Sequence, residues 1–245
     1  MAAFPMSDGL AAGHASVGGA SLRIAGITPF STVDWPGKLA CVAFLAGCPW
    51  RCPYCQNFIL QSADAGTLGA DALFDLLEQR RGLLDGVVFS GGEPLAQPGV
   101  VEAARQAKEM GFEVGLHTCG AYPERLREIL PQLSWVGLDV KAPWDAYDRV
   151  TLARGSGALA RESLEILLDA GVSLETRTTW HPALLSADDI ARIGADLAER
   201  GVRSWAVQAY RSMGTDGSLA DVTVYPSDMP EGAAELFERF EFRRA

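Results

Sequence analysis

Short apolar runs alternate with longer amphipathic segments along most of this 245-residue chain. The runs have the length of strands and are rich in Val, Leu and Phe, and several segments between them end at a glycine, as helices often do. This alternation predicts βαβ units with parallel strand pairing. The predicted strands are 39–45, 86–89, 113–116, 135–140, 173–178 and 204–207, and the predicted helices between them are 71–80, 100–110, 123–130, 157–170 and 187–200.

A further β-type run, 21–30, precedes the first of these strands. The segment between them, 34–37, reads Asp-Trp-Pro-Gly, and its Pro-Gly pair is a turn signal, so we expect an N-terminal β-hairpin. Residues 1–20 are rich in Ala, Gly and Ser and carry no secretory signal, so a flexible tail is expected there. No linker interrupts the remainder, which we assign to one domain, 21–245, beginning with the hairpin and ending in a C-terminal helix.

Six βα units can close partly into a barrel or lie open as a doubly wound sheet, and periodicity does not decide between the two. Both architectures place ligands at the carboxyl ends of the strands. Polar residues follow the predicted strands at these ends, namely 90–93, 117–118, 139–141, 177–179 and Gln208. No G-x-G-x-x-G follows an early strand, which argues against a Rossmann dinucleotide site.

Three cysteines, Cys48, Cys52 and Cys55, follow the strand 39–45 directly with the spacing C-x3-C-x2-C. Three thiolates can hold three irons of a 4Fe-4S cluster, which leaves one iron open to chelate a small molecule. Structural zinc is the alternative, but it takes four ligands and only Cys52 and Cys55 form a C-x2-C pair. Of the other two cysteines, Cys41 is expected in the core and Cys119 near the site, with roles left open.

The net charge of −10 argues against sequence-independent binding of nucleic acid, because phosphate contacts need a basic face. No apolar run reaches the roughly 18 residues of a membrane helix, so no membrane association is expected. Five cysteines, three of them in one loop, are typical of a reducing cytoplasm rather than of a disulfide framework.

The pattern C-x3-C-x-aromatic-C, with Tyr54 as the aromatic residue, resembles the signature of radical S-adenosylmethionine enzymes. More narrowly, the segments 32–38, 47–48 and 52–57 resemble the longer form of the anaerobic ribonucleoside-triphosphate reductase activating proteins. The resemblance covers roughly residues 22–210 and departs at Gln56, where these activases commonly carry His. It implies a partial (β/α)6 TIM-like barrel as the fold.

The resemblance also implies a set of cofactor contacts. The fourth iron would bind S-adenosylmethionine, the Gly91-Gly92-Glu93 motif would bind its amino group, and the backbone of Tyr54 would lie beside its adenine. Asp139 and Lys141 point to one face of a strand, so they either contact the ligand or pair with each other. Arg177 and Gln208 have the same two interpretations, an ordinary buried hydrogen bond or a contact with the ribose or carboxylate. Structural roles are expected for His117 and His181, and Trp35 and Trp50 would shield the cluster from water.

The implied activity is reductive cleavage of S-adenosylmethionine to a 5′-deoxyadenosyl radical, which removes a hydrogen atom from a backbone glycine of a partner. An anaerobic ribonucleotide reductase is the expected partner, and a flavodoxin or ferredoxin the expected one-electron donor. Two alternatives stay open. The same core could act on another glycyl-radical enzyme or on a small molecule, and a non-catalytic metal-binding adaptor would bind metal without any turnover.

Overall fold

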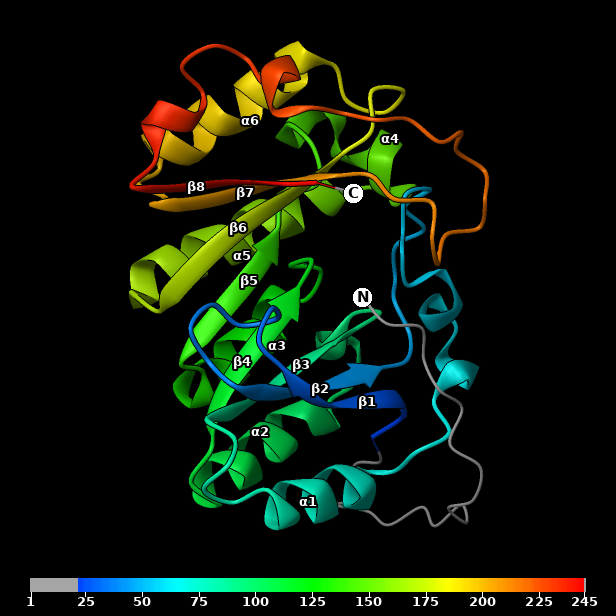
Figure 1. Ribbon diagram of the computed structural model, residues 1–245, viewed down its shortest axis with the longest axis vertical. Coiled ribbons are helices and arrows are strands. Elements are labelled where there is room, and N and C mark those ends of the chain that lie inside the picture. Colours follow the sequence, from blue (N-terminus) through cyan, green and yellow to red (C-terminus); the bar gives the residue numbers. More distant parts are fainter. Residues whose placement is uncertain (1–21, 245) are drawn as a thin grey trace.

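A computed structural model describes residues 22–244 as one curved sheet of eight strands in the order β1 to β8 (Figure 1). β1 pairs with β2 in antiparallel fashion, and every later pair is parallel. No pairing within 22–244 joins β1 to β8, so the sheet is a partial barrel, as expected. The strands are β1 Ile24–Ser31, β2 Ala40–Leu45, β3 Gly86–Gly91, β4 Glu113–Thr118, β5 Trp135–Asp139, β6 Ser173–Trp180, β7 Ser204–Ala209 and β8 Arg239–Arg243.

α-Helices connect the parallel strands from β2 to β7, as the alternation predicts, and pack apolar residues against the sheet. α6 illustrates the rule, because Ile190, Ile193 and Leu197 share its buried face and a capping box at Ser186 starts it. The α-helices are α1 Ala70–Gln79, α2 Gly99–Glu109, α3 Pro123–Ile129, α4 Tyr147–Thr151, α5 Ser156–Ala170 and α6 Ala187–Glu199. Short 3-10 helices lie at Phe58–Gln61, Ala63–Ala65, Pro94–Ala96, Leu130–Gln132, Trp144–Ala146, Pro226–Asp228 and Ala234–Leu236.

The C-terminal region differs from the prediction, because it ends in the strand β8 and not in a helix. Only two single-turn 3-10 helices precede this strand. The sequence of β8 alternates with period two, and its Phe240 packs edge-on against Trp205 of β7 at a ring distance of 5.7 Å. Parallel pairing with β7 therefore satisfies the backbone of this segment and buries its apolar side chains at the same time.

The N-terminal hairpin forms as predicted, and its loop folds into one end of the barrel. Trp35 is buried there and stacks on Trp135 of β5 with ring centres 5.7 Å apart. Its ring lies where a Cβ at Gly86 or Gly115 would come within 3.0 or 2.9 Å, so these glycines leave the space that it fills. The loop thereby closes the barrel at the amino-terminal ends of β3, β4 and β5.

The predicted tail, 1–20, lies outside the described residues. Within 22–244, none of the helices has both the length and the apolar character that crossing a membrane requires.

Candidate active site

A cavity opens at the carboxyl ends of the parallel strands, where the sequence places its polar residues. Both the cysteine loop and the ends of β3 to β7 contribute side chains to it, so segments far apart in the sequence share one site. Of the residues predicted to bind the cluster or the cofactor, those that line it are Cys48, Cys52, Tyr54, Cys55, Gly91, Gly92, Asp139, Lys141, Arg177 and Gln208. Within that predicted set, Glu93 is the one residue that does not line the cavity.

The loop with the three cysteines is fixed by backbone hydrogen bonds at both ends. Where it leaves β2, the N–H of Cys48 donates to the carbonyl of Gln61 at 3.2 Å. Further along, Arg51 N–H donates to the carbonyl of Thr151 at 2.9 Å and Cys55 N–H to that of Cys52 at 3.1 Å. These bonds hold three thiols around one cavity without relying on a secondary-structure element.

No group of three Cys, His, Asp or Glu side chains within 22–244 stands close enough to bind a single metal ion. The three thiols line one cavity from one loop, so they supply three thiolate ligands where a structural zinc site takes four ligands. Three thiolates can bind three irons of a cubic cluster at separate corners and leave the fourth iron open. The arrangement therefore fits a cluster better than a structural zinc site.

Cys119, whose role the sequence leaves open, lies beside Cys48 in the same cavity. A hydrogen bond from the Cys119 thiol lowers the pKa of Cys48, whereas burial raises the pKa of Cys52 to about 11. The only signal in the sequence for this neighbour is its position directly after β4, at the same edge of the sheet as the cysteine loop. Cys41 is fully buried in β2, as expected of a core residue.

Two glycines at the end of β3 pack the cavity wall against the cysteine loop. Gly91 has a φ of +116°, and a Cβ there would lie 2.4 Å from the carbonyl oxygen of Leu45. A Cβ on Gly92 would lie 2.4 Å from the carbonyl of Gly47, so neither position has room for a side chain. The Nδ2 of Asn57 donates to the carbonyl of Gly91 at 3.0 Å, which fixes the end of the cysteine motif to β3.

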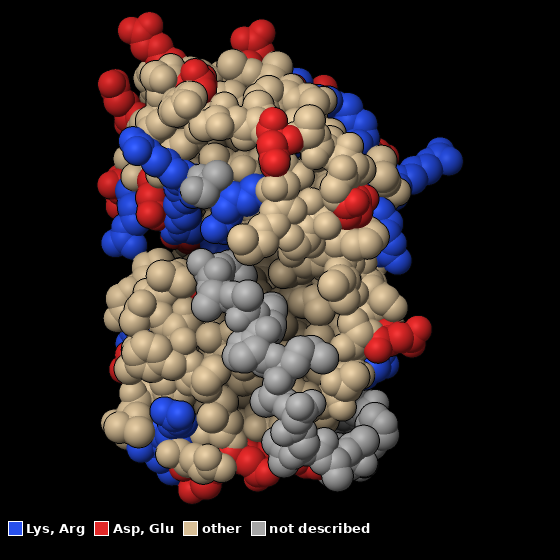
Figure 2. Space-filling view, turned by 45° about the vertical axis from the view of Figure 1, so that its right-hand side comes forward, with Lys and Arg blue, Asp and Glu red and all other residues tan. Residues whose placement is uncertain are grey.

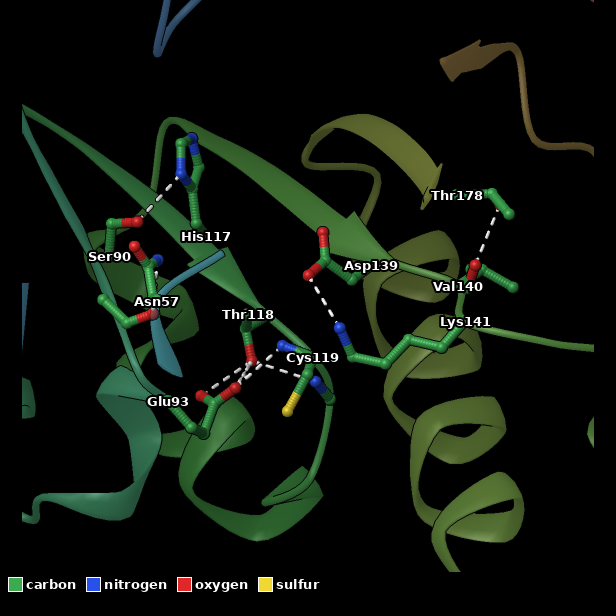
Figure 3. A network of polar contacts seen from close by, with 12 residues as sticks. Asn57, Ser90, Glu93, His117, Thr118, Cys119, Asp139, Val140, Lys141 and Thr178 are labelled. Atoms are coloured by element: carbon green, nitrogen blue, oxygen red, sulfur yellow. Dashed lines mark hydrogen bonds and ion pairs between the residues drawn. The ribbon is translucent and has the colours of Figure 1, made fainter. Parts of the chain in front are cut away.

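Glu93 does not line the cavity and is fully buried, with its carboxylate pointing toward Thr118 and Cys119 (Figure 3). Its carboxylate accepts hydrogen bonds from Thr118 Oγ1 at 2.9 and 3.0 Å, from the Cys119 N–H at 2.7 Å and from the Leu95 N–H at 2.9 Å. Burial raises the pKa of Glu93, although these bonds oppose that rise. The side chain thus fixes the segment after β4 to the end of β3.

Asp139 and Lys141 line the cavity and also pair with each other, at 3.0 Å between Oδ2 and Nζ (Figure 3). The two interpretations of this pair are therefore compatible. The Lys141 ammonium also lies 5.5 Å from the ring centre of Tyr54, a cation–π contact. Burial acts to lower the pKa of Lys141, but the Asp139 carboxylate together with Tyr54, Cys52 and Cys119 outweighs burial, so the pKa is raised and the ammonium stays charged.

Arg177 lies deeper in the cavity, bonded through Nε to Glu175 at 2.8 Å. Its guanidinium packs over Trp135 at 5.2 Å and reaches His117 at 3.1 Å. Burial, together with the nearby Arg177 charge, holds the pKa of His117 well below its usual value, so its imidazole is neutral. His117 is thus a hydrogen-bonding residue of the cavity floor, where it also contacts the carbonyl of Asp34 at 2.8 Å.

The remaining predicted residues, Gln208, His181, Trp50 and Trp35, differ in whether they lie at the cavity. Gln208 reaches the cavity from β7, and no hydrogen bond joins its side chain to another residue of 22–244. His181 contacts the carbonyl of Ala220 at 3.0 Å and does not line the cavity, in keeping with a structural role.

Trp50 is buried at the cysteine loop and packs edge-on against Tyr147 at 5.9 Å, whereas Trp35 lies at the opposite end of the barrel. Only Trp50 is therefore placed to shield the cysteines from water.

One buried polar atom of the cavity region has no partner among the described residues, and it is the hydroxyl of Tyr54. An unpaired buried hydroxyl next to three thiols and a charged pair indicates a site built for a further polar group. Together with the cysteine spacing, this donor set fits an iron-sulfur cluster with a small ligand beside it.

Comparison with known proteins agrees with this geometry. Residues 42–188 match the radical SAM superfamily. A putative glycyl-radical enzyme activating enzyme from Methanocaldococcus jannaschii is 33% identical over 177 residues, which cover 69% of this chain and 73% of that one. A pyruvate formate-lyase-activating enzyme from Clostridium pasteurianum is 30% identical over 202 residues, covering 78% of this chain and 83% of its own.

Solved structures show the same fold at low sequence identity. QueE from Escherichia coli superposes with a TM-score of 0.57 at 16% identity, covering 92% of this chain and 95% of its own. Streptococcus suis SuiB bound to S-adenosylmethionine gives a TM-score of 0.56 at 15% identity over 75% of this chain and 41% of its own. Enzymes of this superfamily use a 4Fe-4S cluster and S-adenosylmethionine, which are the cofactors that the cavity fits. On the family match and the two relatives together, the chain belongs to the radical SAM superfamily.

Proposed function

We propose that this protein is an activase that cleaves S-adenosylmethionine reductively and generates a glycyl radical on a partner enzyme. The observation that carries the proposal is the cavity itself, where three thiols of one loop face the ends of β3 to β7. Two relatives with activating-enzyme names support it, because they resemble most of the chain and not the cysteine motif alone.

In this proposal Cys48, Cys52 and Cys55 hold three irons of the cluster. When bound, the cluster and S-adenosylmethionine supply a reductive cleavage that yields a 5′-deoxyadenosyl radical. The chain binds and orients these groups and excludes water from them. Trp50, which is buried at the cysteine loop, would shield the cluster from water, and the backbone of Tyr54 would contact the adenine.

Charged and polar side chains then orient the ligand. The Asp139–Lys141 pair offers one charge of each sign at the cavity wall, and Gln208 offers an amide with no partner in the described chain. The guanidinium of Arg177, which also lines the cavity, would contact the carboxylate or the ribose of S-adenosylmethionine. Because Glu175 already neutralises Arg177, the added ligand need not balance its whole charge.

Gly91 and Gly92 keep their proposed part in binding the amino group through the backbone. Glu93 contributes to that motif by holding the wall in place, since its carboxylate oxygens are already occupied by Thr118, Cys119 and Leu95. Because Glu93 does not line the cavity, a direct contact between its carboxylate and the amino group would require the side chain to move.

The proposed partner is an anaerobic ribonucleoside-triphosphate reductase, and a flavodoxin or ferredoxin is the proposed electron donor. The segments 32–38 and 52–57 support this choice through their resemblance to the activases of that reductase. The cavity is open at the carboxyl ends of the strands, so a loop of another protein has a route to it.

Electron paramagnetic resonance tests the proposal. Reconstituted and reduced protein is mixed anaerobically with S-adenosylmethionine and purified reductase, and a glycyl-radical doublet is expected on the reductase. Formation of 5′-deoxyadenosine without a doublet would redirect the activity to another glycyl-radical enzyme or to a small molecule. If 5′-deoxyadenosine does not form at all, the non-catalytic adaptor is the correct interpretation.

A further inference from the structure

The loop that follows β7 is fixed onto the cysteine loop at the mouth of the cavity. The Phe58 N–H donates to the carbonyl of Gly214 at 3.2 Å. Gly214 has a φ of +84°, and a Cβ there would lie 2.2 Å from the carbonyl oxygen of Gln56, so only glycine allows this approach. Two segments more than 150 positions apart in the sequence thus form one surface beside the cysteines.

Three large apolar side chains of this surface are exposed to solvent. Ile59 is 76% exposed, Met213 74% and Phe58 43%. Single exposed apolar residues are ordinary on soluble proteins, but these three come from two segments whose neighbours Gln56, Asn57 and Arg211 line the cavity, and together they mark a contact surface. Figure 2 shows the molecule turned toward this side, where most of the visible middle part is uncharged and Lys and Arg side chains lie above it on the left.

Arg211 adds a positive charge to the same surface. Its guanidinium lines the cavity, and its hydrogen bond at 3.4 Å goes to the neutral side-chain amide of Gln56. No acidic side chain of 22–244 forms an ion pair with it, in contrast to the other two cations of the cavity. Lys141 has Asp139 at 3.0 Å and Arg177 has Glu175 at 2.8 Å.

The charge of Arg211 is therefore available for an anionic group that arrives with another molecule. The net charge of the chain is −10, so the protein as a whole does not attract anions. An anionic group would therefore be attracted only locally, at Arg211. The Gln56 amide orients the guanidinium without neutralising it. A His at position 56 would have no side-chain amide oxygen to accept a hydrogen bond from Arg211. The Gln that replaces the commoner His of the activases therefore serves to hold the guanidinium.

We propose that Phe58, Ile59, Met213 and Arg211 form a docking surface for a loop of the partner polypeptide, and that this loop carries an acidic side chain that pairs with Arg211. The proposal rests on the proposed function and adds the chemistry of the partner to it. The apolar residues supply contact area at the rim, and the guanidinium fixes the register of the loop as it enters the cavity.

Binding of the purified reductase, measured anaerobically by biolayer interferometry, tests the surface. Ile59→Ser and Met213→Ser should each weaken binding by about tenfold, as loss of a rim contact worth about 1.4 kcal/mol would do. Leu83→Ser is the matched control, because Leu83 is 63% exposed but lies in the loop before β3, at the opposite ends of the strands. This control should bind like the wild type.

A second series tests the charge. Arg211→Gln should weaken binding and flatten its dependence on salt, whereas Arg211→Lys should retain most of both. Each acidic residue near the target glycine of the reductase is then changed to its amide. One of these changes should reproduce the loss seen with Arg211→Gln and cause no further loss when the two are combined.

Three results would overturn the docking surface. They are equal weakening by Leu83→Ser, unchanged binding of all the surface variants, or self-association of the protein alone that Ile59→Ser abolishes, since a second copy would then occupy the surface. Radical formation by the wild type alongside unaffected variants removes the docking surface and leaves the proposed function standing. Absence of both binding and radical with the wild type removes the docking surface for the reductase together with the reductase as partner, whereas the formation of 5′-deoxyadenosine decides separately whether the activase function stands.

Discussion

The carboxylate of Glu93 accepts a hydrogen bond of 2.7 Å from the backbone N–H of Cys119. This bond links the end of β3 to the residue after β4, and both groups are buried. The side chain at position 93 has to accept hydrogen bonds, because the N–H groups of Leu95 and Cys119 and the hydroxyl of Thr118 donate to it.

Replacing Glu93 by Gln should therefore lower the free energy of unfolding of the cofactor-free protein by about 2 kcal/mol, since an amide donor would then face other donors. Urea denaturation followed by circular dichroism measures this loss. Glu102→Gln on the exposed face of α2 is the control and should change stability by less than about 0.5 kcal/mol. An unaltered stability in Glu93→Gln would mean that the carboxylate serves a ligand alone.

Glu175 should confer an acid-dependent part of the stability. It accepts hydrogen bonds from Arg177 at 2.8 Å and from Arg243 at 2.9 and 3.0 Å. Burial alone would raise the pKa of Glu175, but the two guanidinium groups outweigh it and the pKa is lowered. A lowered pKa stabilises the fold above the usual value of 4.5, and the benefit is lost as the pH falls through the folded-state pKa.

Glu175→Gln should thus cost about 3 kcal/mol near neutral pH, because two arginines lose a common buried partner. The difference from the wild type should shrink below about pH 4.5 as the wild-type carboxylate becomes protonated. Urea titrations at several pH values measure it. Glu165→Gln is a matched control, since that carboxylate also meets two arginines but is 47% exposed, and its effect should be small. A difference that does not change with pH would refute the argument.

Cys52→Ala should abolish cluster assembly, whereas Cys41→Ala should not. Cys52 faces the cavity, but Cys41 is enclosed in β2, where burial raises the pKa of its thiol to about 12 and disfavours the thiolate that binds metal. Iron and acid-labile sulfide per chain after anaerobic reconstitution give the readout. Cys119→Ala should retain both, because Cys119 lies outside the ligand loop. Iron loss in Cys119→Ala but not in Cys52→Ala would reverse the assignment.

Tyr54→Phe should raise the free energy of unfolding of the cofactor-free protein by about 1 kcal/mol, because it removes a buried hydroxyl without a partner in the described chain. Tyr210→Phe is the matched control. Tyr210 is equally buried, but its hydroxyl meets Thr215 Oγ1 at 3.3 Å, so this change should lower stability instead. Thermal unfolding of the two variants side by side decides the matter, and a loss of stability in both would show that Tyr54 has a partner after all.

Much of the site could be predicted from the sequence, because its signals are local. The cysteine spacing, the turn at Gly91 and the polar residues at successive strand ends all lie within a few positions of the feature that they indicate. The rule that parallel strands end at one edge then brings these residues together, and the cavity confirms that for all of the proposed residues except Glu93.

The remaining features depend on contacts between distant parts of the chain. Glu93 meets Thr118 across 25 positions, and Arg211 meets Gln56 across 155, so no local pattern reveals either pair. β8 was missed for a related reason. Its five residues hold only two phenylalanines, and they become a strand because β7 offers a free edge to pair with.

Trp35 has a consequence for the order of events. Its stack on Trp135 closes the barrel from the amino-terminal side, so a molecule does not reach His117 from that end. The mouth at Gln56 and Arg211 lies at the other end of the same cavity. On the proposed function, a small ligand would therefore have to enter before a polypeptide covers that mouth.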